Sequence, residues 1–295
     1  MSNVVLIGGT GYVGGRFREE LISRNFKYHN LSRRNFDYYD YNNLVHALNT
    51  HKPDFVINAA GFTGKPNVDQ CEVEKDETIR GNVLLAQIVA QACDACKVPL
   101  VHVSSGCIYS GHKSIDNDGT LVGFTEFDEP NFCFGSPPCS FYSGCKALSE
   151  QVLMDYDNTY ICRLRIPFDN INSPRNFLSK LQMYDTLLQA TNSVSNLNDF
   201  VRVCTELALN RCETGVYNVT NTGYIDTRQV VDMIKTHLNS DKQYKYFDNE
   251  LQFESTAAKT PRSNCVLDNT KILATGFELD HASDSIEKCL VNWSK

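Results

Sequence analysis

The chain has 295 residues, of which 42% are hydrophobic and 21% charged, an ordinary composition for a soluble globular protein. Its net charge of −7 argues against a nucleic-acid-binding surface, which needs an excess of basic residues. The longest apolar runs, such as residues 84–92, are too short and too often interrupted to cross a bilayer.

The N-terminus carries neither a basic segment nor a small-residue cleavage site, so no signal peptide is predicted and a cytoplasmic location is expected. The twelve cysteines are therefore expected to be free thiols in a reducing compartment. The CxxC spacing at residues 93–96 falls within a helical pattern and has no second CxxC elsewhere. Small buried side chains explain this spacing better than a redox or metal site, and no metal is predicted.

The first half of the chain alternates short apolar runs with helical periods. Strands are predicted at residues 4–7, 54–57, 99–103 and 159–164, and helices from the first glycines to about residue 24 and at 42–50, 78–96 and 141–156. Continuous apolar strands between helices are typical of a parallel sheet that is covered on both faces. The sequence therefore predicts a doubly wound α/β fold of the Rossmann type.

After about residue 165 the pattern is looser. We expect a loop at 167–174, helices at 175–184 and 197–210, a strand at 215–219, and a helix at 226–238 with Asp226 as its cap. Residues 244–295 read as irregular. These features divide the chain into a nucleotide-binding domain, residues 1–166, which the strand near 215–220 rejoins, and a smaller substrate-binding lobe, mainly residues 167–295. This lobe should lie beside the carboxyl ends of the strands.

Three glycines, Gly8, Gly11 and Gly14, follow the first predicted strand and open a helix. Glycines at this spacing allow a tight turn and let backbone N–H groups approach a pyrophosphate at the helix N-terminus. Arg33 and Arg34 follow the second strand, where an acidic residue would favour NAD and an arginine suits the additional phosphate of NADP. NADPH is thus the predicted cofactor, with Arg33 or Arg34 at its phosphate, and NADH is the alternative.

Tyr142 and Lys146 are spaced to lie on one face of a helix. An adjacent ammonium group is expected to lower the pKa of the Tyr142 phenol, so that it can exchange its proton near neutrality. Ser105, at the end of a predicted strand, could donate a hydrogen bond to the same carbonyl oxygen. The three residues together predict the reduction of a carbonyl group.

These motifs resemble the extended short-chain dehydrogenase/reductase family, through residues 10–14 and 58–61, Ser105, Tyr142 and Lys146. Residues 52–60 and 261–268 resemble its dTDP-4-dehydrorhamnose reductase branch. Further segments are similar to the bifunctional 3,5-epimerase/4-reductases of UDP-L-rhamnose synthesis, which are of plant type and are also expected in some giant viruses: residues 61–72, 106–108, 130–132, 140–143 and 174–180. The resemblance covers nearly the whole chain and is loose only at about 241–259.

The resemblance implies a set of cofactor contacts and a set of substrate contacts. The implied cofactor residues are Gly8, Thr10, Gly11, Tyr12, Val13, Gly14, Arg33, Arg34, Ala59, Ala60, Gly61 and Lys146. The implied substrate residues are Thr63, Asn67, Cys107, Arg175, Asn176, Arg262 and Asn264, with the arginines and Asn264 at the nucleotide diphosphate.

Cys107 indicates an epimerase activity in addition to reduction. A reductase does not need a thiol two residues after Ser105, whereas an epimerase acting beside a ketone needs an acid/base group near each face of the sugar. A thiol close to a cation can be a general base at neutral pH. The resemblance implies Lys180 as the partner, where related GDP-fucose synthases seem to use a histidine. The plainer alternatives are a packed thiol at Cys107 and a surface helical lysine at Lys180.

The implied reaction starts from UDP-4-keto-6-deoxyglucose, supplied by a UDP-glucose 4,6-dehydratase. Cys107 and Lys180 epimerise C3 and C5; hydride from NADPH then reaches C4 while Tyr142 supplies the proton, Lys146 holds the cofactor ribose and Ser105 orients the oxygen. A homodimer is also expected. Three alternatives stay open: a dTDP-4-dehydrorhamnose reductase without epimerase activity, GDP-fucose-type chemistry, and a non-catalytic NADP-binding regulatory subunit. Gly106 departs from the reductase-only pattern, which has an aspartate-like group there.

Overall fold

A six-stranded parallel sheet forms the centre of the molecule in the computed structural model, which describes residues 2–294. The strand order is β12-β7-β4-β3-β1-β2. Strand β1 pairs with β2 on one side and with β3 on the other, so the chain reverses direction across the sheet between β2 and β3. Ligands of such sheets bind outside the carboxyl ends of the strands at this reversal. The bounds are β1 (Asn3–Ile7), β2 (Lys27–Leu31), β3 (Phe55–Asn58), β4 (Leu100–Ser105), β7 (Thr159–Leu164) and β12 (Gly215–Asn218).

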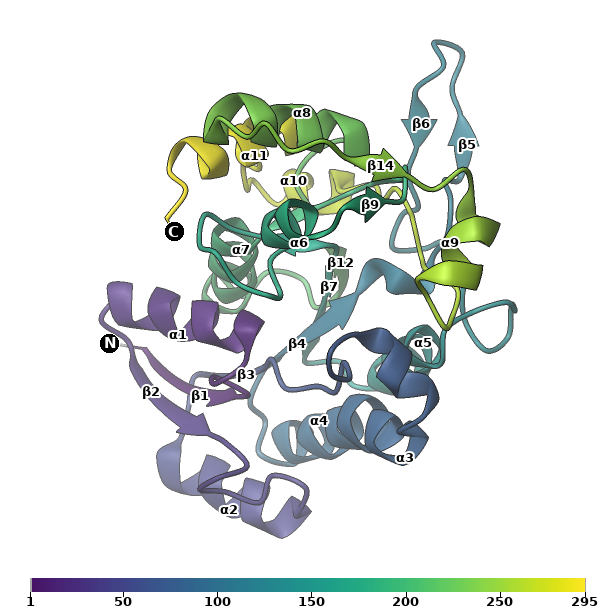
Figure 1. Cartoon of the computed structure of the whole chain (residues 1–295). Coiled ribbons are helices and arrows are strands. Elements are labelled where there is room, and N and C mark those ends of the chain that lie inside the picture. Colours follow the sequence, from purple (N-terminus) through teal and green to yellow (C-terminus); the bar gives the residue numbers. More distant parts are fainter. Residues whose placement is uncertain (1, 295) are drawn as a thin grey trace.

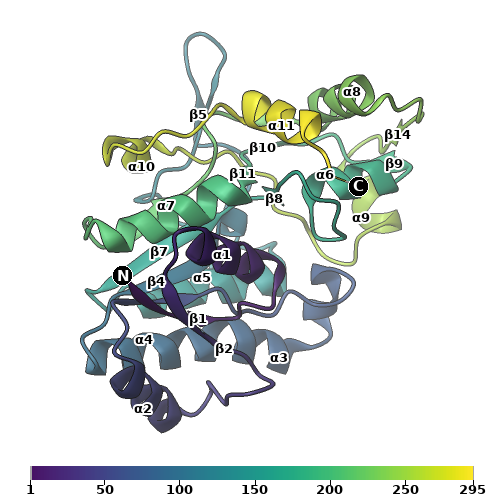
Figure 2. The ribbon, with the colours of Figure 1, turned by 90° about the vertical axis from the view of Figure 1, so that its left-hand side faces the viewer.

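Helices cover both faces of this sheet (Figures 1 and 2). Successive side chains of a strand point to opposite faces, and in β1 all of them are apolar and fully buried from Val4 onwards. Val4 and Leu6 pack with α1 (Tyr12–Ser23) and α7 (Leu197–Leu209). Val5 and Ile7 pack with α2 (Tyr41–His51) and α4 (Leu85–Ala95). The predicted doubly wound Rossmann fold is confirmed.

The long helix predicted at residues 78–96 starts earlier and is not uniform. It runs through α3 (Lys75–Ile79), a π-helical stretch η2 (Arg80–Leu84) and α4. The stretch packs against the loop after β3: a Cβ on Gly81 would lie 2.8 Å from the Cβ of Phe62. Asn82 binds the Phe62 backbone twice, accepting from its N–H (3.2 Å) and donating to its carbonyl (2.8 Å). A local change of helical pitch of this kind is common beside functional sites.

The second half of the chain contributes to both parts of the molecule. Helix α7, strand β12 and helix α10 (Thr270–Ala274) pack on the central sheet, although all three lie within residues 167–295. A separate apolar cluster holds the lobe together, with Phe168, Leu178, Val230 and Ile286 among its buried members. The lobe helices are α6 (Phe177–Met183), α8 (Thr227–Leu238), α9 (Glu250–Thr256) and α11 (Ala282–Val291). In Figures 1 and 2 the helices α8 and α11 lie near the top of the molecule, across from α2 and α4.

Two expectations for this half are wrong. Residues 167–168 are not loop but a short strand, β8 (Pro167–Phe168), which pairs in parallel with β11 (Ser195–Asn196). Residues 244–295 are not irregular, because they contain α9, α10 and α11. Asp226 does cap α8, with a complete capping box to Gln229. No helix within the described residues is long and apolar enough to cross a membrane.

The remaining elements are short. Strands β5 and β6 form an antiparallel hairpin that projects from the top of both views. The bounds are α5 (Phe141–Leu153), β5 (Ser114–Ile115), β6 (Leu121–Val122), β9 (Thr186–Leu187), β10 (Thr191–Asn192), β13 (Ile225–Asp226), β14 (Lys245–Tyr246), and the 3-10 turns η1 (Val68–Glu72) and η3 (Gly106–Ile108).

Candidate active site

The turn after β1 has no room for a side chain at Gly8 or Gly14. Gly8 has a φ of +85°, and a Cβ there would lie 2.6 Å from the backbone nitrogen of Ala60. A Cβ on Gly14 would overlap the Gly8 carbonyl oxygen. Gly11, the N-cap of α1, donates its N–H to that carbonyl (3.0 Å) and supplies no capping side chain. The free N–H groups of α1 are thus open to a phosphate group.

A cleft of about 500 Å³ opens beside this turn. Most of the predicted cofactor residues line it: Gly8, Thr10, Gly11, Arg33, Arg34, Ala59, Ala60 and Gly61. With a glycine cradle at one end and basic side chains at the other, the cleft has the shape and lining that NADPH needs. The sequence missed Ser32, Tyr38, Tyr39, Phe62, Lys65, Glu77, Gly81 and Leu85, because no local motif marks these residues and only the fold brings their segments together.

Four predicted cofactor residues do not line the cleft: Tyr12, Val13, Gly14 and Lys146. The side chains of Tyr12 and Val13 pack against the core formed with α1 and α7, so a contact of these two residues with the cofactor would use their backbone N–H groups at the start of α1. Gly14 acts instead through its close packing on Gly8.

Ser105, Tyr142 and Lys146 meet between β4 and α5. Ser105 ends β4, and its hydroxyl accepts the N–H of Cys107 (3.2 Å). Tyr142 lies in the first turn of α5, and Lys146 is buried one turn later with its Nζ donating to the Val103 carbonyl (3.0 Å). Glu72 fixes the start of α5 by accepting the N–H of Phe141 (2.7 Å).

The electrostatics of Tyr142 differ from the sequence expectation. Burial raises the pKa of Tyr142 well above its usual value, and the neighbouring Cys107 adds to this rise, while Ser105 and Arg175 act in the opposite direction. The expected lowering by the Lys146 ammonium is therefore wrong, because removal of the phenol from water has the larger effect. Tyr142 is held in the protonated state, which is the state that a proton donor needs.

Burial lowers the pKa of Lys146, whereas Cys107 and Glu150 act to raise it. Cys107 therefore faces both Tyr142 and Lys146. Its side chain is 8% exposed and belongs to the turn η3 directly after Ser105. All twelve cysteines are free, as expected. Unlike Cys107, a thiol such as Cys93 is fully buried in the apolar core. The position of Cys107 brings a thiol to the same carbonyl site as the predicted reductase residues.

Lys180 lies on α6 of the lobe, close to Arg175 and Arg262. Burial is the largest cause that lowers its pKa, followed by the charges of Arg175 and Arg262. Arg175 donates to the Thr63 hydroxyl (3.1 Å) and to the Gly64 carbonyl (2.9 Å). Arg175 thus ties the lobe to the loop that follows β3, and Lys180 and Arg262 lie close to it.

Arg262, the second arginine of the lobe, is bound to the turn η1, which comes after that loop. Arg262 forms an ion pair with Asp69 (2.7 Å), in the turn η1. Lys259 donates its backbone N–H to the same carboxylate (3.1 Å). Asp69 therefore holds the segment around residue 260 against the nucleotide-binding domain.

The predicted asparagines have mainly structural contacts. Asn176 is fully buried, caps α6 by accepting the N–H of Leu178 (3.0 Å) and donates to the Asp169 carboxylate (2.9 Å). It is therefore not available to a substrate, which corrects its assignment. Asn67 caps η1. Asn264 donates to Glu250 (3.0 Å) and accepts from Asn192 (3.1 Å).

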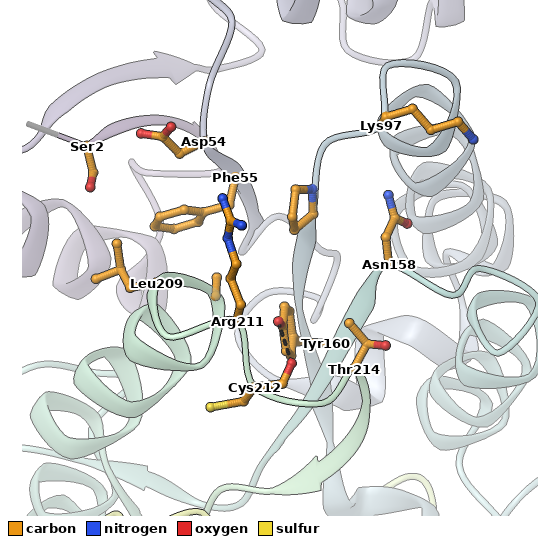
Figure 3. A pocket seen from close by; sticks show the side chains of 12 residues that line it. Ser2, Asp54, Phe55, Lys97, Asn158, Tyr160, Leu209, Arg211, Cys212 and Thr214 are labelled. Carbon is orange, nitrogen blue, oxygen red and sulfur yellow. Dashed lines mark hydrogen bonds between the residues drawn. The ribbon is translucent and has the colours of Figure 1, made fainter.

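A larger hollow of about 760 Å³ lies at the other end of the sheet (Figure 3). It surrounds the amino ends of β3, β4 and β7, near Phe55, Pro99 and Tyr160. Its cations, Lys97 and Arg211, follow the C-terminal ends of α4 and α7, where positive charge complements the helix dipole. None of the predicted site residues lines it, so the hollow is separate from the candidate active site.

Comparison with known proteins identifies the family. The model of the RmlD substrate binding domain matches residues 1–294. The chain belongs to this family. It is 34% identical to the bifunctional dTDP-4-dehydrorhamnose 3,5-epimerase/dTDP-4-dehydrorhamnose reductase of Arabidopsis thaliana, over 97% of this chain and 91% of that protein. The predicted relationship to the dehydrorhamnose reductase branch is confirmed.

A longer relative shares only part of its length with this chain. A trifunctional UDP-glucose 4,6-dehydratase/UDP-4-keto-6-deoxy-D-glucose 3,5-epimerase/UDP-4-keto-L-rhamnose-reductase of Arabidopsis thaliana is 32% identical over 96% of this chain but only 41% of its own length. This chain thus spans about two-fifths of that enzyme.

Solved structures share the fold. The L780 UDP-rhamnose synthase of Acanthamoeba polyphaga mimivirus superposes with a TM-score of 0.90 at 22% identity over 99% of both chains. A dTDP-4-dehydrorhamnose reductase of Bacillus anthracis in complex with NADP gives 0.80 at 19% identity over 98% of both chains. At these identities the likeness concerns the fold alone.

Proposed function

We propose that the chain is a bifunctional 3,5-epimerase and NADPH-dependent 4-reductase that converts UDP-4-keto-6-deoxy-D-glucose to UDP-L-rhamnose. The observation that carries this proposal is the thiol of Cys107 beside Tyr142 and Lys146. Family membership supports the reductase half. The name of the Arabidopsis relative that matches nearly the whole chain, which includes both activities, supports their combination in one domain.

The reduction uses the groups around the end of β4. NADPH supplies the hydride that reaches C4 of the sugar. Tyr142, kept protonated by its buried surroundings, donates the proton to the C4 oxygen, and Ser105 orients that oxygen by a hydrogen bond. Lys146 holds the cofactor ribose and restores charge balance beside the phenolate.

The epimerisation uses the same ketone. The C4 carbonyl acidifies the hydrogens on C3 and C5, so that Cys107 as a thiolate can remove a proton and leave an enolate. Lys180 returns a proton from the opposite face and inverts the carbon. Its lowered pKa suits this task, because a less basic ammonium gives up its proton more readily near neutrality. Exchange with water restores both groups before the next inversion.

Arg175 and Arg262 are proposed to hold the nucleotide diphosphate. Arginine binds phosphate oxygens through paired donors, and these two side chains lie close to Lys180. Both also bind the loop around Thr63 and Asp69, so the substrate would be held where the lobe meets the nucleotide-binding domain. A dehydratase that oxidises C4 and removes the C6 hydroxyl group of UDP-glucose must supply this substrate.

The proposal is tested with Cys107→Ser and a matched control, Cys133→Ser, a half-buried thiol packed nearby against the cluster around Ile108. Each protein is incubated with UDP-4-keto-6-deoxyglucose in heavy water without NADPH, and deuterium at C3 and C5 is measured by mass spectrometry. We expect Cys107→Ser to lose exchange at least tenfold and to keep its affinity for NADPH, and Cys133→Ser to match the parent. Unchanged exchange in Cys107→Ser would reject the role of the thiol.

A further inference from the structure

A buried ion pair lies directly behind the predicted catalytic helix. Arg163 of β7 and Glu150 of α5 are joined by hydrogen bonds of 2.8 Å (Nη2 to Oε2) and 3.1 Å (Nε to Oε2), and their side chains are only 1% and 3% exposed. Replacing such a pair by apolar residues is often neutral or stabilising, so stability alone is a weak reason for its presence. Its neighbours indicate another role.

The Glu150 carboxylate joins the two elements that carry the reductase residues. Ser104 donates its hydroxyl to Glu150 Oε1 (2.5 Å), and Ser104 directly precedes Ser105 in β4. On α5, Glu150 lies four residues after Lys146, which lies four residues after Tyr142, so all three share one face of the helix. A single carboxylate thus sets the position of α5 along β4.

Arg163 anchors this carboxylate from the far side. Its Nη1 donates to Asn218 of β12 (3.4 Å), and its guanidinium lies over the Tyr109 ring, 5.2 Å from the centroid. The Glu150 carboxylate has a donor on each oxygen. A buried network that is hydrogen-bonded in this way is rigid and fixes one geometry.

Glu150 also opposes the effect of burial on Lys146. Burial favours the neutral amine, while Cys107, Glu150 and Cys145 favour the ammonium. From β4, the imidazole of His102 has its pKa lowered well below the usual value by burial and by Lys146, so it adds no charge near neutrality. The groups close to Lys146 are therefore Cys107 on η3, Glu150 and Cys145 on α5, and His102 on β4, and Arg163 of β7 lies against Glu150.

We propose that Glu150 is a positioning residue of the reductase site: its carboxylate, anchored by Arg163, holds α5, and with it Lys146, in register with Ser105 at the end of β4. This inference rests on the proposed roles of Lys146 and Ser105. It leads to a specific expectation about pH. Without the carboxylate, Lys146 loses its proton at lower pH, and both NADPH binding and reduction fail earlier on the alkaline side.

The test separates this role from a structural one. Glu150→Gln leaves Arg163 as an unpaired buried charge and is expected to lower the melting temperature, whereas Glu150→Gln/Arg163→Met removes both charges and should recover it. The dissociation constant for NADPH is measured against pH by fluorescence, and kcat is measured in parallel. The control is Glu206→Gln, which breaks an ion pair with Arg24 (2.6 Å) between α1 and α7, away from α5.

We expect the alkaline limb of NADPH binding to move down by about one pH unit in both Glu150 variants, including the double variant with recovered stability, and to stay unchanged in Glu206→Gln. The inference would be overturned if the alkaline limb of NADPH binding shifted only in variants with a lowered melting temperature. It would also be overturned if the limb did not move in the double variant. NADPH binding can be measured without turnover. If the parent protein failed to reduce the sugar, the proposed function would be contradicted, but the pH dependence of NADPH binding could still be interpreted.

Discussion

Gly106 lies between Ser105 and Cys107, and its replacement by alanine tests the packing behind the site. A Cβ on Gly106 would lie 2.5 Å from Cδ1 and 3.4 Å from Cγ of Leu267, a buried residue. The first distance is far below a van der Waals contact, so either Leu267 or the turn η3 must shift. Gly106→Ala is therefore expected to destabilise the protein by about 1–3 kcal/mol, the usual effect of overpacking a core.

The assay is urea unfolding followed by circular dichroism, in a double-mutant cycle with Leu267→Ala. Leu267→Ala alone is expected to cost about 2–5 kcal/mol, and the double variant should cost less than the sum, since the new methyl group fills part of the cavity. Gly15→Ala is the matched control: its Cβ would meet no atom within 4 Å. Alanine inside helix α1 should stabilise the protein by about 0.5–1 kcal/mol.

The same variant is informative about the site. If η3 rather than Leu267 moves, Ser105 and Cys107 move with it, and exchange and reduction should both fall while NADPH still binds. Strictly additive costs in the cycle, or a Gly106→Ala protein as stable as the parent, would refute the packing argument.

Three further predictions concern other contacts. Arg175→Leu removes the lobe's hydrogen bonds to the loop after β3 and should raise KM for the nucleotide sugar about 10- to 100-fold with little change for NADPH; equal losses for both ligands would contradict it. Asp128, beside Lys113 (2.6 Å), has its pKa lowered to about 2, so its stabilisation is present above about pH 4 and is lost as the pH falls through about 2. Asp128→Asn should then cost about 1–2 kcal/mol in urea unfolding at pH 7, a cost that disappears below pH 2, whereas a pH-independent cost would show that the charge is irrelevant. Asn82→Ala frees the Phe62 backbone and should weaken NADPH binding about tenfold by fluorescence titration, and unchanged affinity would exclude this support.

Local patterns were sufficient for most of the fold. The apolar strands and the glycine turn predicted the parallel sheet, and the spacing of Tyr142 and Lys146 placed them correctly on one helix. The short helices after residue 244 were not seen, because each has too few turns for a clear period. The Glu150–Arg163 pair was also missed, since it depends on how a helix lies on the sheet and not on sequence spacing.

The errors at the site have the same origin. Asn176 has the chemistry of a phosphate ligand, but whether an amide faces a ligand or caps its own helix is decided by the loop around it. The pKa of Tyr142 was expected to fall from its spacing to Lys146 alone, yet burial, which no local pattern reports, raises it. The glycine motif correctly placed Tyr12 and Val13 at the start of α1, but it does not report that their side chains pack in the core.

The central claim is that one pocket both epimerises and reduces. The most direct measurement is the position of deuterium in the product formed from UDP-4-keto-6-deoxyglucose and unlabelled NADPH in heavy water, read by proton NMR. We predict UDP-L-rhamnose with deuterium at C3 and C5 and unlabelled hydride at C4. A reduced sugar that keeps hydrogen and the original configuration at C3 and C5 would contradict the claim and leave a simple reductase.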